Sequence, residues 1–65
     1  MIMQITNWRT TNGEKLWINL DKVVTLSDYV QVVNGRYVQE IIVGDQHLFV
    51  TGNDYRNIKQ ALQMS

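Results

Sequence analysis

The chain of 65 residues contains no cysteine and no proline, and its charges cancel. Without cysteine it can form no disulfide, although small domains often depend on such cross-links because they bury little apolar surface. Six basic residues balance six acidic ones, so no net charge draws the protein towards nucleic acid or an acidic membrane. Self-association is therefore an open question from the outset, because it is another way in which a small domain gains stability.

The sequence also lacks a long hydrophobic run, and none approaches the roughly 18 residues that span a membrane. Residues 1–6 have neither the basic region nor the apolar stretch of a secretory signal. Together with the absence of cysteine, these features predict a cytoplasmic protein. The composition is that of a globular chain, and its length predicts one domain over residues 1–65.

Turn residues divide the first fifty positions into short β-rich segments. Asn12-Gly13 and Asn34-Gly35 favour two-residue type I′ turns, which need two positive φ angles, and Gly44-Asp45 is a weaker form of that signal. Between the turns, β-branched and aromatic residues predict an antiparallel meander of about five short strands. The expected strands are 3–8, 15–20, 24–33, 36–43 and 46–51, with a turn or a single helical loop at 19–22.

After Gly52 the apolar residues recur at helical spacing, with polar residues on the other side. Asn53 or Asp54 is the expected N-cap. A helix of about ten residues is too short to persist alone, so it must dock on the sheet. The predicted fold class is therefore α+β, an antiparallel meander with one C-terminal helix packed on it. The apolar side of the helix comprises Tyr55, Ile58, Ala61 and Leu62.

Both faces of the predicted sheet are apolar. A two-residue loop at Asn34-Gly35 sets Val33 opposite Arg36 and fixes which side chains share a face. One helix covers one face, so sheet curvature, a second chain or a partner must close the other. The first face carries Leu26, Val30, Val32, Tyr37, Ile41, Val43, Leu48 and Val50, and the second carries Tyr29, Val33, Val38, Ile42, His47 and Phe49.

No pattern in the sequence indicates a catalytic or metal site. His47 is the only histidine, and a zinc site around it would need carboxylates in no recognised spacing. Ser27 and Ser65 form no recognised nucleophile motif with it, and the acidic residues are scattered rather than paired. No glycine-rich loop fits a nucleotide. We therefore expect no enzyme activity, no cofactor and no metal.

Aromatic residues and arginines are the types enriched at the centres of protein interfaces, and an apolar second face would surround them. The sequence thus predicts a small non-enzymatic protein-interaction or oligomerisation module, with a homo-oligomer as the expected form and no membrane partner. The alternative is a small nucleic-acid-binding protein that stacks bases on aromatic residues of one sheet face. The expected partner-binding residues are Trp17, Tyr29, Ile42 and Phe49.

The segment Asn12-Gly13-Glu14-Lys15-Leu16-Trp17-Ile18-Asn19, followed by Asp21 and residues 23–26, resembles the opening of the small FlbD-like proteins. In that family an Asn-Gly turn leads into a short strand that ends in Asn. The strand containing Leu48-Phe49-Val50, which runs into a terminal helix, is also similar to that family, and such patterns occur in bacteriophage and prophage proteins. The resemblance implies an accessory or adaptor role in a bacterial or bacteriophage setting, and it implies no active-site residue.

Overall fold

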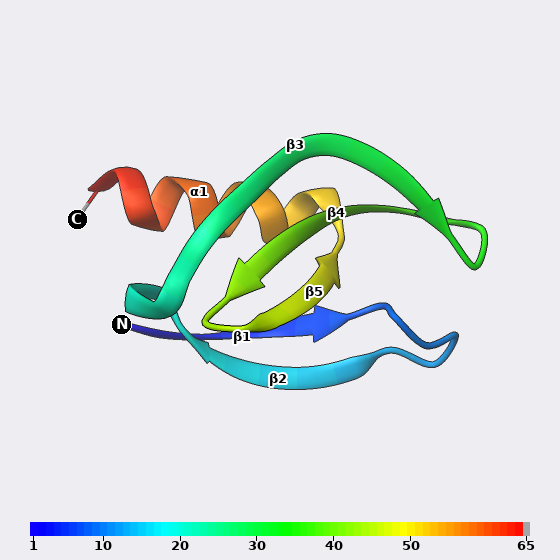
Figure 1. Ribbon diagram of the computed structural model, residues 1–65, viewed down its shortest axis with the longest axis horizontal. Helices are drawn as coiled ribbons and strands as arrows, with labels where there is room; N and C mark the ends of the chain where they lie inside the picture. The colour runs from blue at the N-terminus through cyan, green and yellow to red at the C-terminus, as the bar shows by residue number, and fades with distance from the viewer. Residues whose placement is uncertain (65) are drawn as a thin grey trace.

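The computed structural model describes residues 1–64 as five antiparallel strands, a 3₁₀ turn and a C-terminal helix (Figure 1). The predicted α+β class is confirmed, and each predicted strand end lies within one residue of the observed one. The elements are β1 (Ile2–Asn7), β2 (Glu14–Asn19), η1 (Leu20–Lys22), β3 (Val23–Val33), β4 (Arg36–Val43), β5 (Gln46–Val50) and α1 (Gly52–Met64).

The strands form two sheets, β1-β2 and β3-β4-β5, so the expectation of one continuous meander is wrong. The chain changes sheet at η1, where the Asn19 side chain accepts a hydrogen bond from the Asp21 amide at 3.0 Å. This capped turn redirects the backbone between β2 and β3. The sheets meet again where the Trp8 amide donates to the Phe49 carbonyl at 2.7 Å.

Two of the three predicted turns are confirmed. Asn34 and Gly35 have φ angles of 52° and 76°, as a type I′ turn requires, and Gly44-Asp45 closes the β4–β5 hairpin between Val43 and Gln46. The two-residue turn at Asn12-Gly13 is wrong, because the β1–β2 connection spans residues 8–13. This loop folds around the Trp8 ring, so closely that a Cβ atom on Gly13 would lie 2.9 Å from it.

An irregularity in β3 breaks the predicted register. Pairing runs as expected from Val33–Arg36 to Val30–Gln39, but Leu26 then lies opposite Ile41. Residues 27–29 therefore face Glu40 alone, and the unbroken register expected from the sequence is wrong. Because the shift is by two residues, Leu26 stays on the face of Ile41. The bulge lets Asp28 reach Tyr55 of α1, which a regular strand would not.

The main core lies between the two sheets and the helix, which packs against β4 and β5. Tyr55 and Ile58 of α1 are buried, as the helical spacing predicts, while Ala61 and Leu62 are partly buried. Burial of these apolar side chains is the main stabilising contribution. The core consists of Ile5, Ile18, Leu20, Ile41, Leu48, Val50, Tyr55 and Ile58.

The helix begins at Gly52, two or three residues before the start that its predicted N-caps imply. Thr51 Oγ1 accepts from the Asp54 amide at 3.4 Å, and the Thr51 carbonyl accepts from the Tyr55 amide. Thr51 is thus the N-cap, and the prediction of Asn53 or Asp54 is wrong. Asp54 has a different role, because its carboxylate accepts a hydrogen bond from the Thr6 amide of β1 at 3.2 Å.

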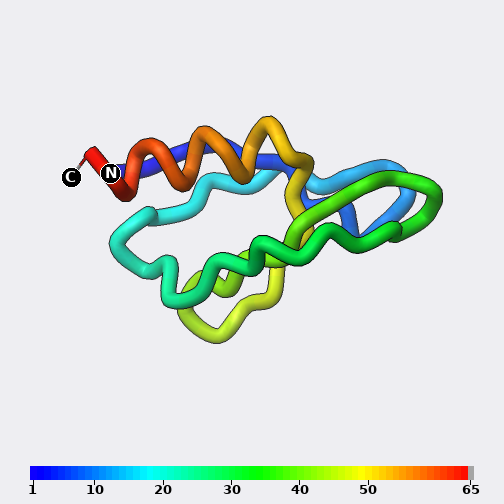
Figure 2. The backbone as a smooth tube through the Cα atoms, turned by 90° about the horizontal axis from the view of Figure 1, so that it is seen from above, coloured from blue at the N-terminus to red at the C-terminus, as the bar shows by residue number. Residues whose placement is uncertain are grey.

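The second face of β3-β4-β5 is partly closed by the chain itself. Val38 on that face is buried, and Val33, Ile42 and Phe49 are half-buried. The tip of the β3–β4 hairpin and the 8–13 loop extend to the same end of the molecule in both views (Figures 1 and 2). Curvature and this loop thus cover part of the face for which a partner was one of the expected solutions.

Candidate functional site

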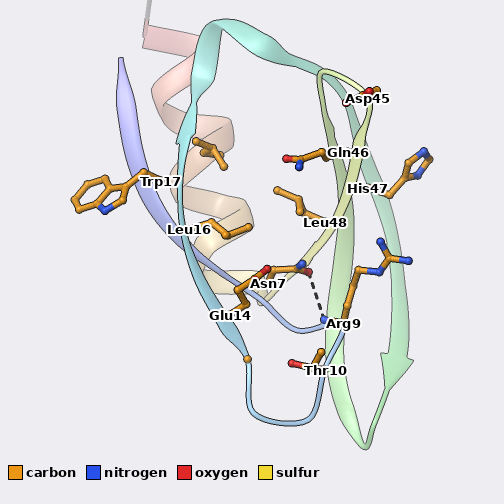
Figure 3. A pocket seen from close by; sticks show the side chains of 12 residues that line it. Asn7, Arg9, Thr10, Glu14, Leu16, Trp17, Asp45, Gln46, His47 and Leu48 are labelled. Atoms are coloured by element: carbon orange, nitrogen blue, oxygen red, sulfur yellow. Dashed lines mark hydrogen bonds between the residues drawn. The ribbon is translucent and has the colours of Figure 1, made fainter.

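The four residues expected to contact a partner do not gather at one place. Trp17 is exposed on β2 and points away from β5 (Figure 3). Ile42 and Phe49 lie on one face of β4-β5 but are half-buried, and Tyr29 is exposed within the β3 bulge. The single contact face would need one continuous sheet, and the chain forms two. A binding role for each of the four stays a prediction.

The exposed apolar side chains that do gather lie at the tip of the β3–β4 hairpin, residues 30–37, which we call the arm. Val32 lies opposite Tyr37, and Val30 lies two positions before Val32 on β3, so all three side chains share one face. Their exposed fractions are 53% for Val30, 64% for Val32 and 73% for Tyr37. We call these three residues the arm patch.

The arm patch belongs to the face that the sequence assigns to the helix side, and the course of the helix explains why it stays uncovered. Val50 at the end of β5 pairs with Gln39, and α1 begins two residues later and runs away from the tip of the hairpin (Figure 1). The helix therefore covers Ile41 and its neighbours but not the tip of the hairpin. The sequence signal that could have found this surface is the shortness of the predicted strand 46–51, which a two-residue turn at 44–45 lets reach only as far as residue 38.

The opposite face of the arm is held by the 8–13 loop. The Arg36 guanidinium lies 3.7 Å from the centroid of the Trp8 ring, a close cation–π contact. Val38, next on the same face of β4, is buried. Within residues 1–64, Trp8 Nε1 is buried without a hydrogen-bond partner, so the contact with Arg36 is made by the face of the ring. The arm is thus closed on one face and exposed on the other.

A pocket of about 900 Å³ opens between β2 and β5 (Figure 3). Leu16 and Leu48 line its interior, and Arg9 and Glu14 lie near one end. Asn7 at its base is buried, and its Oδ1 accepts from the Phe49 amide at 3.0 Å and the Arg9 amide at 3.3 Å. The contact with Phe49 joins the two sheets and the contact with Arg9 fixes the start of the 8–13 loop, so Asn7 has a structural role.

His47 lies at the rim of this pocket, and its Nδ1 lies 2.7 Å from Glu40 Oε2 on the neighbouring strand. The His47 side chain is 56% exposed and the Glu40 side chain 27%. Among residues 1–64, no group of three His, Asp or Glu side chains is placed to hold a metal ion. Ser65 lies outside the described residues.

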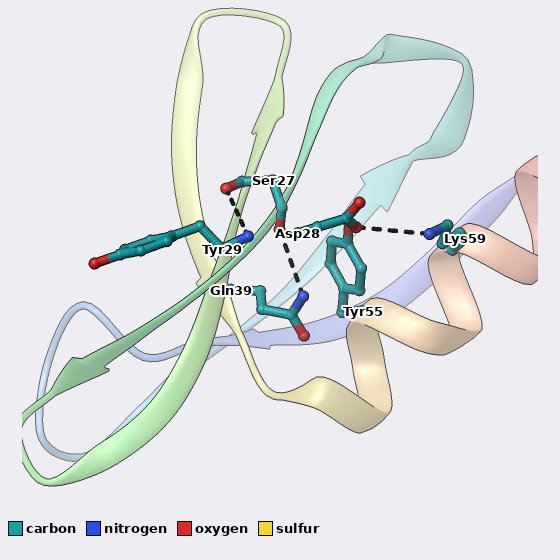
Figure 4. A network of polar contacts seen from close by, with 6 residues as sticks. All are labelled: Ser27, Asp28, Tyr29, Gln39, Tyr55 and Lys59. Atoms are coloured by element: carbon teal, nitrogen blue, oxygen red, sulfur yellow. Dashed lines mark hydrogen bonds and ion pairs between the residues drawn. The ribbon is translucent and has the colours of Figure 1, made fainter.

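A polar network fixes the base of the arm to the helix (Figure 4). Tyr55 donates a hydrogen bond from its hydroxyl to Asp28, and Lys59 Nζ lies 3.6 Å from the same carboxylate. The hydrogen bond from Tyr55 and the charge of Lys59 lower the pKa of Asp28. Burial and the hydrogen bond to Asp28 raise the pKa of Tyr55 to about 12. Both pKa shifts are those expected when Tyr55 and Lys59 of α1 hold Asp28 of β3 in place, and we call this set of contacts the clamp.

Comparison with protein-family models, with curated proteins and with solved structures found no match for the chain. The resemblance to the FlbD-like proteins therefore stays a prediction. In the part of the chain that the structure describes, no helix combines the length and hydrophobicity needed to cross a membrane.

Proposed function

We propose that the protein is a small non-enzymatic interaction module whose arm patch binds another polypeptide chain. The observation that carries this proposal is that Val30, Val32 and Tyr37 share one face of the arm and are each more than half exposed. Contiguous exposed apolar side chains of this kind mark interaction sites in soluble domains. Tyrosine is also among the residue types enriched at interface hot spots.

Contacts on the other face of the arm and at its base favour binding, because they hold the arm in one conformation before a partner binds. Trp8 and Arg36 brace one face, and the contact of Asp28 with Tyr55 fixes the base of the hairpin. A surface that is already ordered loses less conformational entropy when it binds. An adaptor of this kind fits the role that the FlbD-like resemblance implies, and the cytoplasmic location and bacterial or bacteriophage setting belong to the same proposal.

Binding of nucleic acid is the weaker alternative. The exposed rings of Tyr29 and Tyr37 could stack on bases, but Arg36, the cation of the arm, is already placed over Trp8. The chain has no net positive charge to add phosphate contacts. Retention on a polyanion column that falls steeply with salt would support this alternative.

The proposed function is tested by capture with three tagged forms of the protein: the wild type, Val32→Asp and Val24→Asp. Val24 is a matched control, since it lies in the same strand and is 65% exposed compared with 64% for Val32. The untagged protein and an extract of the native host serve as prey. We expect the wild type and Val24→Asp to capture the same chain and Val32→Asp to lose it. Capture that is equal for all three forms, or absent for all, contradicts the proposal.

A further inference from the structure

The outer edge of β3 differs from the other strand edges in residues 1–64. The edges of β1 and β5 meet where the Trp8 amide donates to Phe49, and the Thr6 amide of β1 donates to Asp54. The edge of β2 carries Lys15, a charged residue of the kind that discourages strand pairing. Residues 29–33 of β3 contain no charge and no proline. This stretch therefore lacks the charged and proline residues that commonly prevent a further strand from pairing.

The hairpin geometry determines which backbone groups point outward from this edge. Val33 and Arg36 close a two-residue turn, and such a closing pair is hydrogen-bonded across the hairpin. Backbone groups alternate along a strand, so those of Gln31 also point to β4. The N–H and C=O groups of Val30 and Val32 therefore point away from the sheet, and the side chains of both residues are exposed.

We propose that β3 of one copy pairs antiparallel with β3 of a second copy, about a two-fold axis at Gln31. The inference rests on the proposed function and specifies its partner and geometry. In this register Gln31 faces Gln31 of the second copy, and Val30 faces Val32. The outward backbone groups of Val30 and Val32 then meet as hydrogen-bonded pairs, which is the pattern of an antiparallel ladder.

A second copy is the partner that the sequence of this edge fits. The register sets Val30 against Val32 and Tyr29 against Val33, and β-branched and aromatic residues favour such cross-strand pairs. No like charges face each other, since Asp28 lies opposite Asn34 of the second copy. The same strand edge meets itself, as a two-fold interface requires. The bulge at residues 27–29 ends the regular edge, so the contact is short and dimerisation depends on concentration.

A single cysteine tests this register directly, because the chain has none of its own. Facing residues of a non-hydrogen-bonded antiparallel pair have Cα atoms about 4.5 Å apart, within the range of a disulfide. Gln31→Cys should therefore convert most of the protein to a disulfide-linked dimer under mild oxidation. Val24→Cys lies outside the contact and should stay largely monomeric. Val32→Pro in the Gln31→Cys background should abolish cross-linking, because it removes an outward N–H group while leaving the β4 ladder intact.

Amide hydrogen exchange is a second test of the β3 pairing and uses the wild-type protein. The amides of Val30 and Val32 should gain protection as concentration rises, whereas those of Gln31 and Val33 should be protected throughout because they bond to β4.

The outcomes separate this pairing from the proposed function. Arm-dependent self-association without cross-linking of Gln31→Cys overturns the β3 pairing and leaves the interaction module intact. Equal cross-linking of Gln31→Cys and Val24→Cys also overturns it, because it shows random collision. A heterologous protein that requires Val32, found with a chain that stays monomeric, overturns the pairing but supports the module. A monomer with no arm-dependent partner overturns both.

Discussion

The guanidinium of Arg36 lies 3.7 Å from the centroid of the Trp8 ring and joins the tip of the β3–β4 hairpin to the β1–β2 loop. Arg36 begins β4 and Trp8 begins the 8–13 loop, so their contact connects the arm to the loop between the two strands of the other sheet. The exposed surface that we assign to partner binding is the opposite face of this braced hairpin.

Loss of the contact between Arg36 and Trp8 should destabilise the arm. Arg36→Ala should lower the free energy of unfolding by about 1 kcal/mol, the size of a partly desolvated cation–π contact. Arg56→Ala on the exposed side of α1 is the control and should change it by less than about 0.5 kcal/mol. Urea unfolding of the three proteins measures the difference. Equal stability of the Arg36 variant and the wild type would show that Trp8 does not depend on the cation.

Gly13 and Gly35 allow the Trp8 packing to be separated from backbone strain. Both have φ angles near +75°, but a Cβ atom at Gly13 would lie 2.9 Å from Thr6 and Trp8, whereas one at Gly35 would meet nothing within 4 Å. Each alanine variant should lose about 1 to 2 kcal/mol from the left-handed backbone, and Gly13→Ala should lose more because of the clash. Thermal unfolding that ranks Gly35→Ala as the less stable protein would contradict this packing.

Stability should fall at both extremes of pH because of Tyr55 and Asp28. The pKa of Tyr55 is raised from 10.0 to about 12, so its contribution is complete below pH 10 and is lost as the pH rises towards 12. The pKa of Asp28 is lowered from 3.8, so its contribution is present above that pH and is lost as the pH falls below it. Tyr55→Phe should flatten both limbs in a plot of Tm against pH. Parallel curves for the two proteins would argue against the clamp.

The docking of the helix rests mainly on Ile58. This side chain is fully buried, so Ile58→Ala should cost about 2 to 5 kcal/mol. Leu62 is only partly buried, so Leu62→Ala should cost less than Ile58→Ala. Denaturant unfolding of both variants gives the comparison. A larger loss of stability for Leu62→Ala than for Ile58→Ala would show that the helix docks mainly through residues nearer the end of α1.

Local patterns predict the elements of this fold well because the signals act over a few residues. The turn at Asn34-Gly35 and the change to helical spacing after Gly52 each depend on adjacent side chains, and the structure has both. The division into two sheets depends on long-range contacts such as Asn7 with Phe49. The β3 bulge brings together Asp28 and Tyr55, which are far apart in sequence. The hydrophobic periodicity of the sequence does not predict such long-range contacts.

The candidate site was missed for the same reason. The sequence places Val30, Val32 and Tyr37 on the face that it assigns to the helix, and alternation alone cannot show that α1 runs away from the tip of the arm (Figure 1). The sequence predicts Trp17 and Phe49 as partner-binding residues because they are aromatic. In the structure, however, Phe49 is half-buried and its carbonyl accepts a hydrogen bond from the Trp8 amide, directly after β1. Exposure of an aromatic residue is a tertiary property, and it depends on which strands the turns bring together.

The central claim, that the arm patch is a contact surface, is tested most directly by light scattering over a range of concentrations. The monomer has a mass of 7.6 kDa. The wild type and Val24→Asp should rise towards twice that mass as concentration increases, whereas Val32→Asp should stay monomeric while keeping the circular dichroism of the wild type. A rise that Val32→Asp shares would contradict the account, as would a mass that is independent of concentration in all three proteins together with no protein captured from the host extract through Val32.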